Sequence, residues 1–375
     1  MDGRLTPEQQ AIKQSIQSLV SDSIEPIAAD IDQTASFPES VWDELAALDL
    51  TALTVPEQVG GIEADPVTAS LVNEEVARGA LAIATSLSVH HLATACIAEF
   101  GSDAQHERWL PAMAEGRPVG AFALSEPQAG SNPADLQTEA RPDGDQYVLN
   151  GEKQWITNGK RAGVYILFAR TDRSDPATIT QFVVPGDVDG LQVGEPEDKL
   201  GLRASDTTTL TFENARIPAE NRLTPVGDGL SAALHILTGG RVAIASQAVG
   251  VAQAALERTI EYCTQREQFG GPIADIQSVQ HTVAEMATKT DAARLLAREA
   301  ARQRRTGDGR MAASMAKYFA SETAMAVTNS AVQLHGGYGY VTDGTVERLY
   351  RDAKVTEIYE GTTEIQKTVI ARELF

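Results

Sequence analysis

The chain carries Arg351-Asp352-Ala353-Lys354 and, after four further residues, Tyr359-Glu360-Gly361-Thr362. This stretch lies between helical segments, and a carboxylate held there between Tyr and Gly is well placed to point into a cavity. A surface glutamate in a turn is the commoner outcome for this residue type. Glu360 is therefore a candidate catalytic base only if the surrounding sequence supplies a site.

The region around this stretch, residues 229–375, predicts a helical bundle. Long segments rich in Ala, Leu, Gln, Glu and Arg run at about 230–264, 276–305 and 309–335, and a shorter one lies near 343–353. Three long helices and one short helix suit an antiparallel four-helix bundle.

Residues 1–120 predict a second helical domain. Thr6-Pro7-Glu8-Gln9 has the capping-box pattern with Pro at the first helical position. Asp65-Pro66 opens another strong helix, and Ser102 caps a helix that runs to about Gly116.

Residues 121–228 are β-rich. Asn150-Gly151 predicts a hairpin within 147–156, because Asn-Gly supplies the two positive-φ positions of a tight turn. Further β-rich runs lie at 164–169, 179–184, Leu191–Val193 and 207–212. Pro and Gly separate these runs, which favours a small antiparallel β-barrel or sandwich over βαβ units. The expected fold is thus α+β with three domains, at 1–120, 121–228 and 229–375.

The 375-residue chain has a formal net charge of −21, from 52 acidic and 31 basic residues. An acidic surface repels nucleic acid and anionic membranes, so neither is an expected partner. The charge fits an ordinary solvated surface. It also fits a halophilic protein from a high-salt cytoplasm, where screening makes self-repulsion tolerable, and that interpretation is preferred.

Several classes of site and location are not expected. The polar residues 1–8 contain no apolar signal region, and no apolar stretch reaches the length of a bilayer span, since 242–256 is interrupted by polar residues. A cytoplasmic location is expected. Cys96 and Cys263 form no disulfide framework, and no His or Cys spacing predicts a metal site. A GxGxxG fingerprint after a strand is missing, which argues against a Rossmann nucleotide site.

Four other segments carry residues suited to a planar ring or a phosphate. The loop at 122–132 offers hydroxyls and bare amides, and 155–159 sets a Trp beside a Thr. The segments 266–277 and 333–337 combine Arg, Phe and paired Gly. Each also has an ordinary interpretation: a β-turn, a core Trp, a helix–helix loop with a solvated Arg, and a Gly helix cap.

Together, in this order, these segments resemble the acyl-CoA dehydrogenase family over essentially the whole chain. The matching motifs are Pro56-Glu57 with Gly60-Gly61, Ser125-Glu126-Pro127 with Ala129-Gly130-Ser131, Trp155-Ile156-Thr157-Asn158-Gly159, Gly240-Arg241, Arg266 with Gln268-Phe269, Gln333 with Gly336-Gly337, and the stretch at 351–362. The resemblance implies an N-terminal helical domain, a middle β-barrel domain, a C-terminal four-helix bundle, and FAD bound between the last two.

The resemblance also implies the site residues. Glu360 matches the catalytic base, and its backbone N–H matches a donor to the thioester carbonyl. The FAD contacts implied within one subunit are Phe122, Leu124, Ser125, Gly130, Ser131, Trp155, Ile156, Thr157, Thr362 and Glu364. Those reaching the FAD of a neighbouring subunit are Arg266, Gln268, Phe269, Gln277, Gln333, Gly336 and Gly337. The implied substrate contacts are Ser131, Thr238, Arg241, Tyr359 and Gly361.

Two departures at the start of the bundle matter. Some family members carry their base on the first bundle helix, but 237–241 holds no carboxylate here, which strengthens Glu360. Many members have Asp where this chain has Thr238, so substrate contacts need not carry over there.

The implied activity is FAD-dependent α,β-dehydrogenation of an acyl-CoA thioester to the trans-2-enoyl-CoA. Glu360 would remove the α-proton, and burial beside Tyr359 should raise its pKa toward the working pH. Electrons would pass to an electron-transfer flavoprotein, and the enzyme would be a homotetramer in fatty acid or branched-chain amino acid degradation. An acyl-CoA oxidase on the same scaffold and a non-catalytic flavin- or acyl-CoA-binding protein are the alternatives. Acyl chain length is not readable, with short or branched groups preferred.

Overall fold

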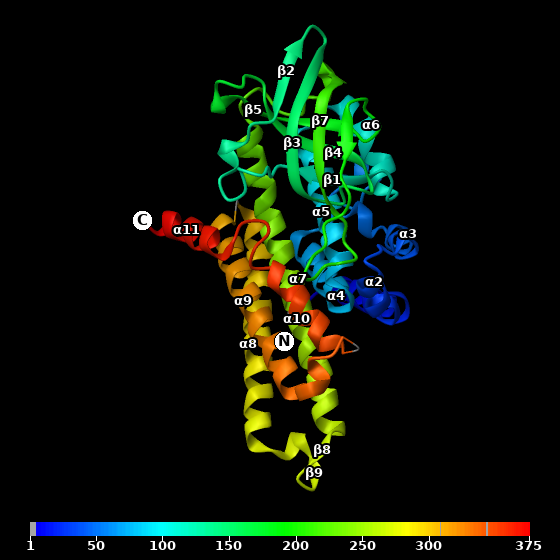
Figure 1. The fold of residues 1–375 in the computed structure, drawn as a ribbon, viewed down its shortest axis with the longest axis vertical. Helices are drawn as coiled ribbons and strands as arrows, with labels where there is room; N and C mark the ends of the chain where they lie inside the picture. Colours follow the sequence, from blue (N-terminus) through cyan, green and yellow to red (C-terminus); the bar gives the residue numbers. More distant parts are fainter. Residues whose placement is uncertain (1–4, 308, 343) are drawn as a thin grey trace.

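The computed structural model describes residues 5–307, 309–342 and 344–375, so part of the polar amino terminus discussed above lies outside it. A helical amino-terminal region and a β-rich region lie at one end of a long helical bundle (Figure 1). The predicted three-part α+β architecture is confirmed. The domain boundaries at 120/121 and 228/229 stay a proposal.

The amino-terminal region is built of short and medium helices. They are α1 (Pro7–Leu19), α2 (Ala28–Thr34), α3 (Glu39–Ala47), α4 (Pro66–Gly79), α5 (Leu81–Phe100) and α6 (Asp103–Ala114). The predicted starts of α1, α4 and α6 are confirmed: Thr6 and Ser102 each form a full capping box, and the Asp65 side chain accepts two backbone N–H groups. These caps stabilise the helices because they satisfy donors that no helical carbonyl can reach.

Helix α5 corrects one expectation. Among the described residues it is the helix long and apolar enough to cross a bilayer by length and composition alone, with a mean hydropathy of 1.5. The prediction that no stretch reaches that length is therefore wrong. However, 89% of that window is buried inside the protein, where α5 packs against β1 and α7 as a core helix.

The middle region is one mixed sheet. Its strands are β1 (Val119–Ala123), β2 (Glu139–Asp143), β3 (Gln146–Thr157), β4 (Ala162–Arg170), β5 (Ile179–Pro185), β6 (Leu191–Val193) and β7 (Thr207–Pro218). The order is β1-β4-β2-β3-β7-β6, with β5 also on β4. The β1–β4 and β2–β4 pairings are parallel, so the expectation of a purely antiparallel domain is wrong. The chain between β1 and β4 is long enough to allow the return that a parallel pairing needs.

The hairpin predicted at Asn150-Gly151 is also wrong. Strand β3 runs through these residues, and the turn lies at Gly144, between β2 and β3. The β3–β7 register shifts after Leu149, and Gly151 has a φ of +146°. Asn-Gly therefore marks a β-bulge, because pairing along the long strand β7 outweighs the local preference for a turn.

The carboxyl-terminal region is the bundle. Its helices are α7 (Gly229–Gln265), α8 (Gln277–Thr306), α9 (Arg310–His335), α10 (Thr345–Val355) and α11 (Thr363–Leu374), with the small strands β8 (Glu267–Gln268) and β9 (Gly271–Pro272) between α7 and α8. The first four helices confirm the predicted segments to within about two residues. α11, which leaves the bundle sideways in Figure 1, is the helical segment expected after Glu360, for which the sequence set no bounds.

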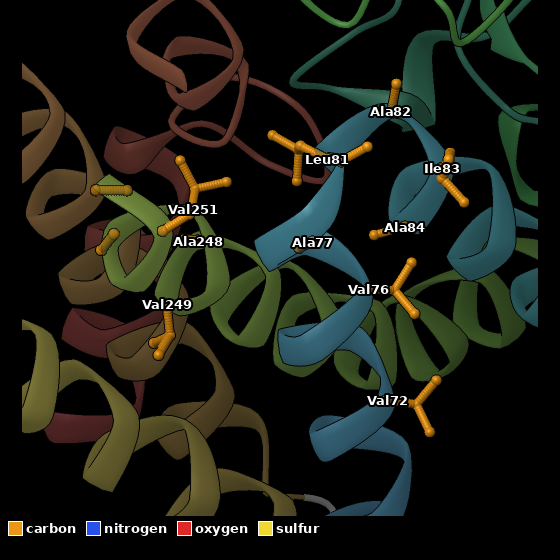
Figure 2. Packing of buried hydrophobic residues seen from close by; sticks show 14 of the residues in the cluster. Val72, Val76, Ala77, Leu81, Ala82, Ile83, Ala84, Ala248, Val249 and Val251 are labelled. Carbon is orange, nitrogen blue, oxygen red and sulfur yellow. The ribbon is translucent and has the colours of Figure 1, made fainter. Parts of the chain in front are cut away.

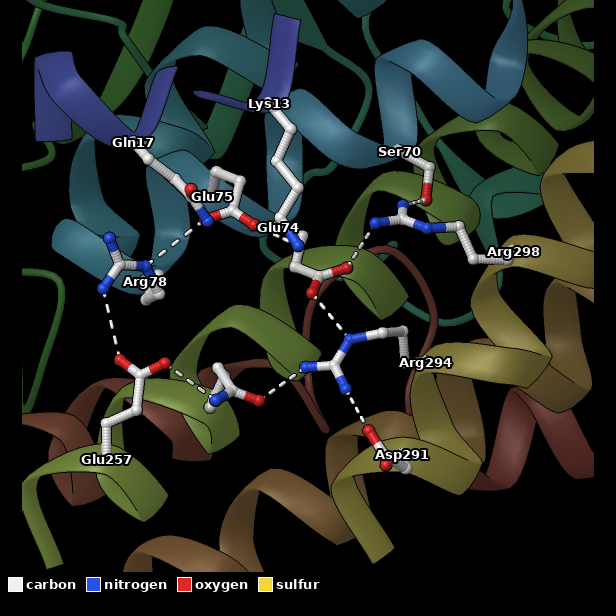
Figure 3. Close-up of polar contacts among 11 residues, drawn as sticks. Lys13, Gln17, Ser70, Glu74, Glu75, Arg78, Glu257, Asp291, Arg294 and Arg298 are labelled. Carbon is white, nitrogen blue, oxygen red and sulfur yellow. Dashed lines mark hydrogen bonds and ion pairs between the residues drawn. The ribbon is translucent and has the colours of Figure 1, made fainter. Parts of the chain in front are cut away.

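Buried apolar and ionic contacts fix the bundle to the amino-terminal helices. Val76 and Leu81 belong to the same buried cluster as Ala248 and Val251 of α7 (Figure 2). Beside them, Glu74 of α4 is buried and binds Arg294 at 2.8 Å and Arg298 at 2.6 Å, both on α8 (Figure 3). Removing one partner of such a buried pair costs about 3–5 kcal/mol, so these ion pairs hold α4 against α8.

Candidate active site

Glu360 lies in the loop between α10 and α11, in an unusual backbone conformation. Its φ is +51°, and that of Gly361 is +91°. The left-handed region is unfavourable for a residue with a long side chain. Two buried donors hold it there. Gln366 Nε2 donates to the carbonyls of Glu360 and Gly361 at 3.1 and 2.9 Å, and Lys317 Nζ donates to that of Gly361 at 2.8 Å.

The Glu360 carboxylate points at the first bundle helix. Its Oε2 is buried and has no hydrogen-bond partner among the described residues. A Cβ added to Gly240 of α7 would lie 2.0 Å from that atom, so only glycine leaves room for the carboxylate in this position. Burial raises the pKa of Glu360 to about 7, against the opposing effect of Lys317 and Arg241. This shift has the direction that the sequence predicts.

Two cations and a free backbone donor surround this carboxylate. Lys317 is fully buried on α9, and Arg241 is 5% exposed on α7. The Arg241 Nε has no partner among the described residues. Within the described part of the chain, the Glu360 N–H also donates to no acceptor. The site thus offers a base near neutral pKa and unused donors for an oxyanion.

The neighbouring Tyr359 ties the loop to the protein interior. Its hydroxyl lies 3.4 Å from Thr85 Oγ1 and 3.4 Å from Gln247 Oε1. Gln247 Nε2 in turn donates to Asn73 Oδ1 at 2.8 Å. This buried polar cluster links α4, α5 and α7 to the residue that precedes Glu360.

The β region presents a second part of the site. Trp155, at the end of β3, is 57% exposed and has a φ of +62°. The backbone N–H of Gln154 donates to the Ser125 carbonyl at 3.0 Å, which joins β3 to the loop after β1. Nothing lies within 4 Å of a Cβ added at Gly130 in this loop. An exposed indole beside an open loop suits a planar ring and its polar edge.

The other residues predicted in this region differ in how far their side chains are exposed. Ser131 is exposed, while Ser125 and Thr157 are half-buried. Phe122 packs on Phe168 at 4.8 Å, and Leu124 and Ile156 lie in the hydrophobic cores. The Leu124 and Ile156 side chains are buried, so these two residues would contact a ligand mainly through their backbone, whereas the Phe122 side chain is half-buried.

A buried ion pair connects the same loop and strand. Lys153 Nζ of β3 donates to Glu126 Oε1 at 2.7 Å and to the Leu124 carbonyl at 3.1 Å. Glu126 also accepts the backbone N–H groups of Gln137 and Thr138. Since both charges are almost fully buried, the pair holds the loop in one conformation.

A third group of predicted residues lies at the far end of the bundle. Arg266, Gln268, Gly336 and Gly337 line a pocket of about 530 Å³ near β8 and β9, at the opposite end of the molecule from the β region (Figure 1). Phe269 beside it is 97% exposed. Gln277 and Gln333 are also exposed but do not line this pocket.

The remaining predicted residues lie near the base loop. Thr362 caps α11 and, with Glu364, lines a smaller pocket of about 260 Å³. Thr238 is buried, and its hydroxyl donates to the Leu234 carbonyl at 3.1 Å, within its own helix. The Thr238 hydroxyl therefore already donates its proton within α7 and is not free to donate to a ligand.

Sequence reasoning missed Lys317, Gln366 and the space above Gly240. A lone lysine at 317 among buried Ala and Ser positions of α9 was a usable signal, because an ammonium group is rarely buried without a partner. Gln366 and Gly240 gave no such signal, since their partners come from other helices.

Comparison with known proteins gives a consistent result. Models of the acyl-CoA dehydrogenase N-terminal, middle and C-terminal domains match residues 6–117, 121–215 and 227–375. The chain is 42% identical to a short-chain specific acyl-CoA dehydrogenase of Rattus norvegicus mitochondria, over 97% of this chain and 89% of the relative. It is 40% identical to the acryloyl-CoA reductase (NADH) of Anaerotignum propionicum, over 100% and 96%.

Solved structures agree with this. Butyryl-CoA dehydrogenase from Megasphaera elsdenii matches with a TM-score of 0.96 and 38% identity, covering 100% of both chains. A chain from a study of the electron transferring flavoprotein of Acidaminococcus fermentans matches with a TM-score of 0.97 and 39% identity, also over 100% of both. An acyl-CoA dehydrogenase of Bacillus anthracis complexed with FAD matches with a TM-score of 0.93 and 32% identity, over 99% of this chain and 67% of that one.

Proposed function

The chain belongs to the acyl-CoA dehydrogenase family, with FAD as its cofactor, and from that premise we propose that Glu360 is the base that removes the α-proton of a short-chain acyl-CoA. The observation that carries the proposal is the buried, unpartnered Oε2 of Glu360, whose carboxyl pKa lies at about 7. A general base works best when its pKa lies near the working pH.

The backbone of the same residue supports a second task. The unused Glu360 N–H can donate to the thioester carbonyl and so acidify the α-carbon, as oxyanion donors do. Holding Glu360 in the left-handed region lets the N–H and the carboxylate serve one substrate. The buried side chain of Arg241 adds positive charge beside the carbonyl being polarised.

The residues present fit FAD. The exposed Trp155, the open backbone at Gly130 and the half-buried Thr157 can receive the ring and its polar edge. When bound, FAD accepts the hydride that leaves the β-carbon. The protein contributes orientation, exclusion of water and the base.

A second copy of the chain completes the cofactor site. Arg266 and Gln268 lie at the opposite end of the molecule from Trp155, so one chain cannot present all of them to one FAD (Figure 1). The pocket at Arg266, with the 97% exposed Phe269 beside it, supports a homo-oligomer in which this end reaches the neighbour's FAD. A homotetramer is the proposed assembly.

The interior behind the base favours short acyl chains. On the side of Tyr359, the interior holds the hydrogen-bonded cluster of Thr85, Gln247 and Asn73, so an acyl group extended in that direction would meet polar groups instead of apolar surface. Displacing these buried polar groups would leave hydrogen bonds unsatisfied. The short-chain specificity of the rat relative points the same way.

An electron-transfer flavoprotein in the cytoplasm is the proposed electron acceptor, in fatty acid or branched-chain amino acid degradation. The structural match from the flavoprotein study of Acidaminococcus fermentans supports this partner. Adaptation to high salt is part of the proposal and rests on the net charge of −21.

The deciding experiment is anaerobic bleaching of the flavin with a panel of acyl-CoAs, from short to long and including branched ones. Bleaching by short-chain substrates, and none in Glu360→Gln, is the expected result. Rapid reoxidation of the reduced flavin in air would favour an acyl-CoA oxidase instead. Net reduction of an enoyl-CoA by NADH would favour a reductase like the relative from Anaerotignum propionicum. Purified protein without bound FAD would favour a non-catalytic binding protein.

A further inference from the structure

We propose that Lys317 is a positioning residue for the base. Its buried ammonium group holds the Gly361 carbonyl and, by its charge, keeps the Glu360 carboxylate ionised for proton abstraction. This inference rests on the proposed role of Glu360.

The burial of Lys317 needs an explanation. The residue is 0% exposed on α9, and the helix positions around it are small buried residues. Within the described part of the chain, Lys317 forms no ion pair, and its Nζ donates to the Gly361 carbonyl at 2.8 Å. Burying an ammonium group without an ion pair is unfavourable. If this position had only a structural role, a neutral side chain would serve it without the desolvation cost of a buried charge.

The geometry shows what Lys317 holds. The Gly361 carbonyl accepts from Lys317 on α9 and from Gln366 on α11, so two helices grip the peptide that follows the base. Glu360 has a positive φ, which is unfavourable for a residue with a side chain, whereas Gly361 adopts its positive φ without strain. The hydrogen bonds from Lys317 and Gln366 to the Gly361 carbonyl therefore fix the direction of the Glu360 side chain and of its N–H.

Charge adds a second effect that Gln366 cannot supply. Glu360 is the largest charge partner acting on Lys317, and Lys317 is the largest acting on Glu360. Burial raises the pKa of Glu360 to about 7 and lowers that of Lys317 to about 8, while each charge stabilises the other. Arg241, from α7, is the second cation facing Glu360. The outer charged groups that act on these two cations are Glu357, Glu364 and Arg310.

Burial raises the pKa of Glu360, and the positive charge of Lys317 lowers it. Removing that charge therefore raises the pKa of Glu360 further. At a given pH, less of the base is then ionised. The acid limb of the pH profile must move to higher pH.

The test compares three variants of the FAD-loaded enzyme. Lys317→Met removes both charge and donor, Lys317→Arg keeps the charge, and Gln366→Met is the matched control that removes donors to the same carbonyl without changing charge. Lys317→Met should shift the acid limb of kcat/KM for butyryl-CoA upward by about one pH unit and lower kcat by about tenfold. Gln366→Met should lower kcat without moving the acid limb, and Lys317→Arg should return the limb toward the wild-type position.

A spectroscopic readout makes the test independent of turnover. The infrared carboxyl band of Glu360 is isolated by subtracting the spectrum of the matching Glu360→Gln variant at each pH. Its midpoint should rise in Lys317→Met and stay in place in Gln366→Met. If Lys317→Met does not fold, Lys317→Gln replaces it, because it is neutral but retains a donor.

Two results would overturn the proposal. One is a Lys317→Met enzyme whose acid limb and carboxyl midpoint match the wild type. The other is an equal shift in Gln366→Met, which would make the effect one of loop packing and not of charge. Failure of the underlying function looks different: Glu360→Gln would then keep wild-type turnover, whatever the carboxyl band showed.

Discussion

Replacing Glu360 by Gln should cost activity and gain stability at once. Gln has nearly the same size, and Lys317 and Gln366 hold backbone carbonyls of the loop, so the loop conformation should persist. Turnover should fall by about 10²–10⁴-fold with the loss of the general base. FAD and acyl-CoA binding should remain.

The size of the stability gain follows from the pKa. The pKa of the Glu360 carboxyl rises from 4.5 to about 7 on folding. As the pH rises through this window, the unfolded chain releases its proton while the folded chain keeps it, so stability falls. One pKa unit corresponds to about 1.4 kcal/mol, so above pH 7 the buried carboxylate costs up to roughly 3 kcal/mol. Gln does not carry this cost.

The assay is thermal unfolding of both proteins across a pH series from about 5.5 to about 8.5, spanning the folded-state pKa. The advantage of Glu360→Gln should be roughly 1.4 kcal/mol at the acid end, which lies about one unit above the unfolded-state pKa, should rise to about 3 kcal/mol near pH 7 and should then level off. The control is Glu357→Gln in the same loop, which loses an ion pair with the exposed Lys354 and a weaker effect of its charge on Lys317. Its difference from the wild type should not grow in that window.

The reasoning fails if the stability difference for Glu360→Gln is flat with pH, because the carboxylate would then not be desolvated in the folded state. Retention of near-wild-type turnover would refute the separate assignment of Glu360 as the base.

Three further outcomes are expected. Gly240→Ala puts a methyl group 2.0 Å from Glu360 Oε2, so the carboxylate must move by more than an ångström; a loss of about 10²-fold in kcat should follow, with the unfolding temperature kept. Gly239→Ala, on the same helix but facing Arg304, should lose far less activity. Lys153→Met leaves the buried carboxylate of Glu126 without its cation, which should destabilise the protein by about 3–5 kcal/mol and release FAD on dialysis; retained flavin would contradict a role for this pair in holding the loop. Finally, the unfolding temperature should rise with KCl as screening weakens self-repulsion, and an unchanged value up to molar salt would rule out the halophilic interpretation.

Local sequence patterns predict the helix starts and the bundle helices correctly. The capping boxes at Thr6 and Ser102 and the long bundle helices depend on contacts within one segment, so their patterns were sufficient. The Asn150-Gly151 turn failed for the opposite reason. Its local preference for a turn was overridden by pairing with β7, which lies far along the chain.

Sequence by itself determined the three-part architecture and the family of this protein, and it singled out Glu360, because its motifs have a fixed order and spacing along the chain. Only the tertiary structure decided the burial, the hydrogen bonding and the pKa of Glu360. The space above Gly240, the grip of Lys317 and Gln366 on the loop, and the buried, unpartnered Oε2 all come from three helices that meet only in the folded chain. A pKa depends on the distance and burial of such neighbours, and no sequence spacing encodes these directly.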